Sequence, residues 1–325
     1  MVFGIGASLY KAIVPPKLPP PTVAFGPLPA IKFPTPVTNS QLTYSLETAT
    51  GGLPSSPEQL PIYYIKPSAA SLFSAESANE KARALGFTGQ PNQLSQTMYE
   101  FIHPSLPKTM EINIVTGEYS ISYNLASDRS PLTGVPPAED TAVSNAKSIL
   151  STAKSMPEDM AEGPAKIEYL KVRDQQLVPA LSLSDASLTR VNFFRKDFGT
   201  EESPYPSVTA VPGRGNIWTL LSGDKDRSKQ LVAAEYHYYE VDEEQSATYP
   251  LKSARDAYQE LTSGGGYIAS YNSAGGTSAK IQQVYLAYYD PNVPSEFYQP
   301  VFVFTGSNNL VAYVPAVDKE YYGVE

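Results

Sequence analysis

The stretch between residues 249 and 317 constrains the fold more than any other part of the chain, because a short amphipathic helix there precedes three aromatic strands. The helix is expected over 250–261, where Pro250 suits a first helical turn, in which its missing N–H costs nothing. Apolar residues recur at helical spacing along one side of it, at Leu251, Ala254, Ala257, Tyr258 and Leu261. Glycines at 264–266 then end the helix.

The three expected strands cover 281–289, 299–304 and 310–314, and they are rich in β-branched and aromatic residues. Asp-Pro-Asn follows the first strand and Gly-Ser-Asn-Asn the second, which is typical of turns between strands. A helix laid over a strand meander buries one face of each element. The stretch therefore predicts a helix packed on an antiparallel sheet.

The same order of elements can be read twice more in the chain. Residues 74–85 predict a helix with Ser74 as N-cap, and three alternating strands follow it. Another helix is expected over 138–156, followed by a strand over 166–173 and a hairpin over 216–241. Recurrence of one unit indicates tandem repeats. The predicted fold class is α+β, with tandem helix-plus-antiparallel-meander units after a proline-rich N-terminal stalk.

This interpretation divides the chain into five parts. They are an apolar segment at 1–14, a proline-rich stalk at 15–40, a first α+β unit at 41–130, an irregular middle unit at 131–212 and a C-terminal α+β unit at 213–325.

The apolar segment 1–14 would span about 21 Å as a helix, less than the roughly 30 Å of a membrane's hydrocarbon core. It also lacks the basic region and the cleavage site of a signal peptide. Three interpretations stay open: the end of a truncated membrane anchor, a partial signal or start-site artefact, and a helix packed on the domain.

The proline-rich residues 15–36 favour an extended polyproline conformation, which at about 3.1 Å per residue could reach roughly 65 Å. A stalk that holds a domain off a membrane is the preferred interpretation, and a proline-rich ligand for an aromatic groove is the rival. Apolar residues such as Phe25 and Phe33 are too many for a free linker. We therefore expect part of this segment to lie in a groove on the domain.

Composition excludes several classes of function. The net charge of −9 argues against nucleic acid or anionic lipid as a partner, because both require clustered basic residues. The chain has no cysteine, so it forms no disulfide and has no thiol nucleophile or thiolate metal site.

A search for catalytic patterns gives no site. His103 and His237 are the only histidines, and no Gly-x-Ser-x-Gly motif is present. In a strand, His237 would share a face with Glu235, and such a pair could act as a base, but a hydrogen-bonded structural histidine is the simpler interpretation. The acidic groups at 242–244 and 224–226 do not follow the pattern of a calcium loop. We expect no catalytic, cofactor-binding or metal-binding residues.

Tyrosine is the remaining unusual feature, with 23 residues in the chain. Many of them fall on expected strands, where most should form core and cross-strand pairs. Rings on an uncovered face could instead form an aromatic binding surface, because tyrosine is favoured at interfaces. The candidate residues for this surface are Tyr236, Tyr238, Tyr285, Tyr289 and Tyr298.

Two regions resemble known families. LGFTGQPNQLSQTMYEF at 85–101, with EINIVTGEYSI at 111–121, resembles PepSY-type units, in which a helix ending in a Leu-Gly turn precedes a strand meander. The helix at 250–261 with VYLAYYD, FYQPVFVFTG and VAYVPAV after it is similar to the C-terminal half of YycH/YycI-like regulatory proteins. The resemblance implies a membrane-anchored, extracytoplasmic bacterial protein without catalytic residues. The chain departs from these families in lacking a full transmembrane helix.

We therefore expect a non-enzymatic binding or regulatory module that contacts another envelope protein or peptide and is tethered to the membrane through its N-terminal segment. The alternative is a structural subunit of a cell-surface assembly, in which the extended N-terminal segment docks on a neighbour and oligomers form. A hydrolase using carboxylates or serines is the least favoured class.

Overall fold

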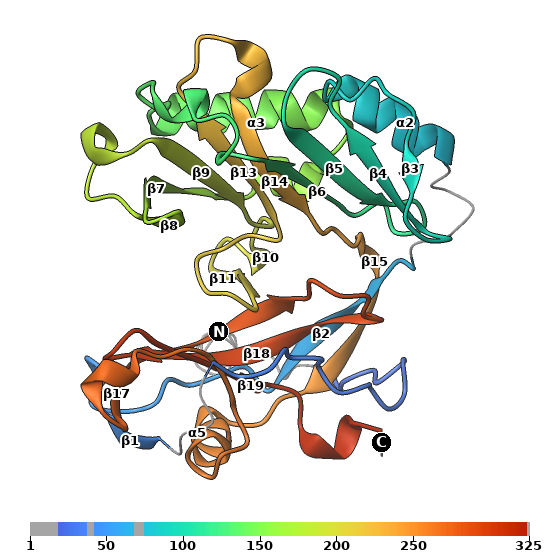
Figure 1. Ribbon diagram of the computed structural model, residues 1–325. Helices are drawn as coiled ribbons and strands as arrows, with labels where there is room; N and C mark the ends of the chain where they lie inside the picture. Colours follow the sequence, from blue (N-terminus) through green and yellow to red (C-terminus); the bar gives the residue numbers. More distant parts are fainter. Residues whose placement is uncertain (1–18, 38–41, 68–74, 324–325) are drawn as a thin grey trace, which may run out of the picture.

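The computed structural model describes residues 19–37, 42–67 and 75–323. The protein is a mixed α+β structure with mostly strands, arranged in two large sheets and one small one, and few helices. Figure 1 shows the nine-stranded sheet above and the eight-stranded sheet below, with the small β10–β11 hairpin between them.

The nine-stranded sheet has the order β3-β4-β5-β6-β14-β13-β9-β7-β8, and its neighbouring strands are antiparallel. Its strands are β3 (Asn92–Gln93), β4 (Met98–Ile102), β5 (Lys108–Asn113), β6 (Tyr119–Tyr123), β7 (Ala165–Arg173), β8 (Gln176–Pro179), β9 (Leu188–Phe193), β13 (Ile217–Ser222) and β14 (Leu231–Tyr236).

Helices α2 (Ala75–Ala84) and α3 (Glu139–Thr152) lie on one face of this sheet (Figure 1). Their alanines pack with Met110, Val191 and Phe193 in one buried core, to which α4 (Glu158–Glu162) adds Met160. Small alanine side chains let the helices approach the sheet closely. Among the described residues, no α-helix covers the opposite face of the sheet. The loop after β6, with the short 3-10 helix η1 (Ser130–Leu132), packs Leu125 and Leu132 onto part of this face.

The eight-stranded sheet has the path β1-β17-β18-β19-β16, with β2, β12 and β15 joined at its side. Its strands are β1 (Thr43–Leu46), β2 (Gln59–Ile65), β12 (Ser207–Thr209), β15 (Val241–Pro250), β16 (Tyr267–Ser270), β17 (Ser278–Asp290), β18 (Phe297–Gly306) and β19 (Leu310–Pro315). The small sheet pairs β10 (Phe198–Thr200) with β11 (Ser203–Tyr205).

The C-terminal stretch forms the predicted helix and three adjacent antiparallel strands, with one correction at the start of the helix. Helix α5 (Ala254–Thr262) packs on β19, and β17, β18 and β19 are neighbours in one sheet. Pro250 is the last residue of β15 and not a helical residue. The helix starts after Ser253, whose side chain accepts a hydrogen bond from the N–H of Asp256 and so satisfies one free donor of the first turn.

The strand pairings divide the chain differently from the predicted units. Strands β1 and β2, expected in the unit 41–130, pair with β17, β15 and β18 in the eight-stranded sheet. The hairpin β13–β14, expected in the unit 213–325, pairs with β9 and β6 in the nine-stranded sheet. The physical reason is that hydrophobic periodicity identifies a strand but does not select its partner.

The proline-rich segment lies along the eight-stranded sheet throughout residues 19–37, so a free-standing stalk is wrong for these residues. Leu28 is fully buried and forms a parallel bridge with Tyr322, while Phe25 packs on Phe297 with ring centroids 4.8 Å apart. Apolar side chains of the segment stabilise it against the sheet more than extension into water would. The apolar segment 1–14 and the expected N-cap Ser74 lie outside the described residues. In the described ranges, no helix is long and apolar enough to cross a membrane.

Candidate functional site

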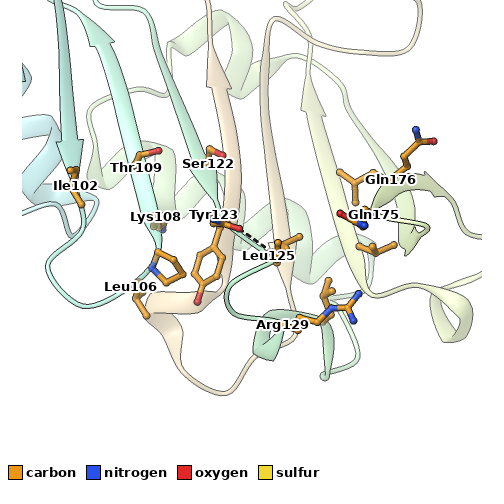
Figure 2. A pocket seen from close by; sticks show the side chains of 16 residues that line it. Ile102, Leu106, Lys108, Thr109, Ser122, Tyr123, Leu125, Arg129, Gln175 and Gln176 are labelled. Atoms are coloured by element: carbon orange, nitrogen blue, oxygen red, sulfur yellow. Dashed lines mark hydrogen bonds between the residues drawn. The ribbon is translucent and has the colours of Figure 1, made fainter. Parts of the chain in front are cut away.

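A groove of about 940 Å³ lies on the open face of the nine-stranded sheet. Its lining includes Ile102, Thr109, Ser122, Leu125, Gln176 and Leu177. Figure 2 shows Ile102 and Thr109 on one side of it and Gln176 on the other, with sheet strands between them. The groove therefore extends across strands from both halves of the sheet.

Alternation along the strands places this groove opposite the helices. Met110 and Ile121, which are paired across β5 and β6, point into the helix-covered core. Their neighbours Thr109 and Ser122 are also paired and point the other way, because successive side chains of a strand lie on opposite faces (Figure 2).

The loop after β6 forms one end of the groove and is held by Asp128. The Asp128 carboxylate accepts hydrogen bonds from Tyr123 Oη at 2.6 Å and from Lys229 Nζ at 2.9 Å, and its other oxygen accepts one from the N–H of Ser130. Together these donors hold the pKa of Asp128 well below its usual range. The loop that carries Leu125 is thus fixed in place without a covering helix.

The β7–β8 hairpin forms the opposite wall. Asp174 and Gln175 both have positive φ, at 51° and 62°, which is the two-residue turn that matches the twist of a tight hairpin. This turn projects β8 from the edge of the sheet. Leu177 on β8 is 41% exposed, although it is a large apolar residue.

The lining of the groove combines apolar, neutral polar and basic side chains. Ile102 and Leu177 present exposed apolar side chains on opposite walls, and Thr109, Ser122 and Gln176 add hydrogen-bonding groups. Mixed apolar and polar lining of this kind suits the side chains and main chain of a bound polypeptide. No carboxylate or histidine is among the side chains that line it.

His237 lies elsewhere, in a hydrogen-bonded cluster with two glutamates. Its Nδ1 is 3.1 Å from Glu118 Oε1 and its Nε2 is 3.0 Å from Glu235 Oε2. Hydrogen bonds to Glu118 and Glu235 raise the pKa of His237 to about 9. Tyr239 and Thr116 also donate to Glu118, so each group already has a partner. His237 is thus held by hydrogen bonds to two glutamates.

Arg195 forms a second buried cluster, where the two large sheets meet. Its guanidinium donates to Asp159 in α4, to Asp290 at the end of β17 and to the carbonyl oxygen of Tyr239. It also lies over the ring of Tyr238, 4.6 Å from the centroid. Burial opposes the charge, but Asp290 and Asp159 hold the pKa of Arg195 above its usual value. Each of the three guanidinium nitrogens donates a hydrogen bond within the protein, so this cluster links the two sheets.

The five candidate tyrosines do not form one surface. Tyr298 is fully buried, stacks on Tyr288 and hydrogen-bonds Ser207. Tyr236 stacks on Tyr119 in the helix-covered core, and Tyr238 contacts Arg195.

Tyr285 and Tyr289 belong to the eight-stranded sheet. Tyr289 is buried, and Tyr285 is the one candidate that is exposed, at 37%. The prediction of a shared aromatic surface is therefore wrong, because most of these rings are needed to fill the two cores.

The other sequence candidates are surface groups. His103 accepts hydrogen bonds from the N–H groups of Ser105 and Leu106 and so stabilises a loop. Among the residues that the structure describes, no group of three or more potential metal ligands occurs.

Fold and site together define a two-sheet α+β protein with an open, grooved face. Comparison with known proteins finds no matching family model and no matching curated protein. Among solved structures, an uncharacterized protein from Eubacterium rectale has a TM-score of 0.47 at 12% identity, covering 89% of this chain and 92% of that one. The Bacillus megaterium YpeB C-terminal domain has a TM-score of 0.34 at 12% identity, covering 77% and 94%. Neither likeness assigns the chain to a family.

The sequence carries only part of the signal that marks the groove. Thr109 and Glu111 alternate with buried residues in β5, which indicates an uncovered face. What the sequence did not reveal is that β7–β8 comes to lie across from β5, since these strands are separated in the sheet by β6, β14, β13 and β9.

Proposed function

We propose that this protein is a non-enzymatic binding module whose groove takes an extended segment of a partner protein of the cell envelope. The carrying observation is a groove of about 940 Å³, with the exposed apolar side chains of Ile102 and Leu177 in its lining, on a sheet face that no α-helix covers in the described part of the chain. Apolar side chains gathered in one groove and bordered by polar groups are typical of interaction surfaces, whereas exposed apolar residues scattered singly are not.

The proposal includes an extracytoplasmic, membrane-tethered location and a PepSY-like arrangement of tandem helix-plus-meander units. Its support is the resemblance of residues 85–121 and 250–317 to PepSY and YycH/YycI-like proteins. The consecutive antiparallel strands β4, β5 and β6 after α2 agree with that arrangement.

Site-specific photo-cross-linking tests the groove as the binding site. A benzophenone amino acid is placed at Ser122, inside the groove, and at Arg83, which is exposed on α2 on the opposite face. Illumination of the cells that make the protein should give a discrete adduct from position 122 and none from position 83.

The matched test of specificity is Ser122→Trp with a benzophenone at Thr109. Filling the groove with an indole should remove the adduct from position 109, because the occupant is excluded. A hydrolase would be favoured instead if no adduct formed and the purified chain cleaved an ester or peptide substrate. Either equal adducts at 83 and 122 or a product of hydrolysis would overturn the proposal.

A further inference from the structure

A second site lies on the eight-stranded sheet, beneath residues 29–37, which we call the strap. Phe33 of the strap stacks on Tyr267 with ring centroids 4.8 Å apart and planes 5° apart, and it meets Tyr289 edge-on at 4.8 Å. Ile31 packs against the same cluster of tyrosines and valines. The strap is therefore held mainly by two side chains on an aromatic surface.

Its main chain contributes little to this contact. The Nε2 group of Gln299 donates to the carbonyl oxygen of Pro29 at 3.0 Å, and the N–H of Val37 donates to the carbonyl oxygen of Ile268 at 3.2 Å. A strand fully joined to a sheet would exchange hydrogen bonds at every second residue. The strap resembles a bound peptide more than a strand of the sheet.

The strap also fills its site incompletely. A cavity of about 130 Å³ remains between residues 29–32 and the sheet, with Tyr289 and Gln299 in its lining. Gln299 is 3% exposed and Tyr289 is 2% exposed, yet Gln299 Oε1 and Tyr289 Oη have no hydrogen-bond partner. Buried polar atoms without partners are costly, so this site favours an occupant that supplies the missing groups.

Gln299 Oε1 lacks a hydrogen-bond donor because the residue opposite it, Pro29, is a proline. In an extended chain, the N–H and C=O of one residue point to the same side, and a glutamine amide can pair with both. Gln299 pairs with the C=O of Pro29, but proline has no N–H to donate to Oε1. Any other residue at this position could complete the pair.

We propose that this surface is a peptide-binding site, independent of the groove, and that the strap is an intramolecular occupant that a partner segment displaces. The partner segment is extended, with an N–H donor opposite Gln299, an aliphatic side chain two residues later and an aromatic one four residues later. A tethered strap acts at an effective concentration of about millimolar, so it keeps weak ligands out of the site.

Peptide titration onto the full chain tests this proposal. The peptides carry residues 27–37, one unchanged, one with Pro29→Ala and one with Phe33→Ala, and the protein carries Phe33→Ala to weaken its own strap. The Pro29→Ala peptide should bind this protein about fivefold more tightly than the unchanged peptide, since one added hydrogen bond contributes about 1 kcal/mol. The Phe33→Ala peptide should not bind, and the wild-type protein should bind every peptide at least about tenfold more weakly.

The matched control adds Gln299→Leu to the Phe33→Ala protein, which removes the amide while keeping a similar volume. The preference for the Pro29→Ala peptide should then disappear. An unchanged preference, or no binding of either peptide at about 1 mM to a chain that circular dichroism shows to be folded, overturns the proposal.

One substitute variant and one further measurement complete the test. Ile31→Ala replaces Phe33→Ala if the latter does not fold. Light scattering of the wild-type chain with and without peptide detects exchange of straps between copies. If the wild-type chain forms a dimer that the peptide dissociates, the occupant of the site is the strap of a second copy of this chain. That result would overturn the proposal that a segment of a different protein binds there.

Discussion

The two large sheets differ in what covers their second face. Each has helices on one side: α2 and α3 on the nine-stranded sheet, and α5 on the eight-stranded sheet (Figure 1). The second face of the eight-stranded sheet is packed with Ile31 and Phe33 of the strap. The second face of the nine-stranded sheet carries the groove. The helix-covered face of each sheet holds a buried core. The second faces differ, because the strap occupies the one on the eight-stranded sheet and the groove on the nine-stranded sheet has no occupant from the described chain.

The largest expected effect is on the junction between the sheets. Arg195→Met should lower the free energy of unfolding by about 3–5 kcal/mol, because it leaves the buried Asp290 and the partly buried Asp159 without their cation. Trp218, the single tryptophan, reports on the nine-stranded sheet by fluorescence, while circular dichroism reports on both sheets. In the variant these two unfolding curves should separate.

The control for the junction is Arg173→Met, since Arg173 and its partner Asp174 are both exposed. That change should alter the free energy of unfolding by less than about 0.5 kcal/mol. Coincident curves and an unchanged stability in Arg195→Met would mean that the cluster does not couple the sheets.

A smaller effect is expected where the strap covers its sheet. Phe33→Ala should destabilise the protein by about 2 kcal/mol, below the usual cost for a buried phenylalanine, because Phe33 is only half-buried. Phe33→Leu should recover about half of that loss. Thermal unfolding measures both. A midpoint that does not move in Phe33→Ala would show that the strap does not stabilise this face.

The His237 cluster should make stability depend on pH. The pKa of His237, about 9, lies above the ordinary value of 6.5. The stabilisation that His237 contributes is therefore complete below pH 6.5 and is lost as pH rises through 9. Because a third of the side chain is exposed, screening by solvent reduces the contribution to roughly 1 kcal/mol. The unfolding free energy of the wild type should approach that of His237→Gln between these pH values. If the unfolding free energies of the two proteins change with pH in the same way, the pairing of His237 with Glu118 and Glu235 is contradicted.

The smallest effect on stability is expected in the open groove. Ser122→Trp replaces an exposed side chain, so the free energy of unfolding should change by less than about 0.5 kcal/mol, while cross-linking of a partner is lost. Denaturant titration beside the cross-linking experiment separates these outcomes. A loss of stability of several kcal/mol would mean that the groove is part of the folded core.

Much of the local structure follows from the sequence, and the reason is periodicity. The stripe of Ala254, Ala257 and Leu261 is buried in α5, and β17, β18 and β19 form adjacent strands. The start of α5 was misplaced because Pro250 fits both a first helical turn and the last residue of a strand.

Which strands pair with one another could not be predicted from periodicity. Nothing in the pattern of residues 43–65 distinguishes pairing with the next strands from pairing with strands near the C-terminus. The tyrosine prediction failed for a related reason. Tyr285 and Tyr298 look alike in sequence, but Tyr285 faces solvent and Tyr298 fills the junction between the sheets. Arg195 shows no sequence signal at all, since its partners lie in α4, at the end of β17 and in the segment between β14 and β15.

The pairing of β2 with β15 has a consequence during synthesis. Ile65 pairs with Val241, and Thr43 pairs with Ser278, so both early strands emerge from the ribosome well before their neighbours are made. Until then their edges are open to association with other nascent chains. All strands of the nine-stranded sheet lie between Ile65 and Val241 in the sequence. This sheet can therefore assemble first and bring these two residues close together. The order of translation thus favours assembly of the nine-stranded sheet before the eight-stranded sheet is completed.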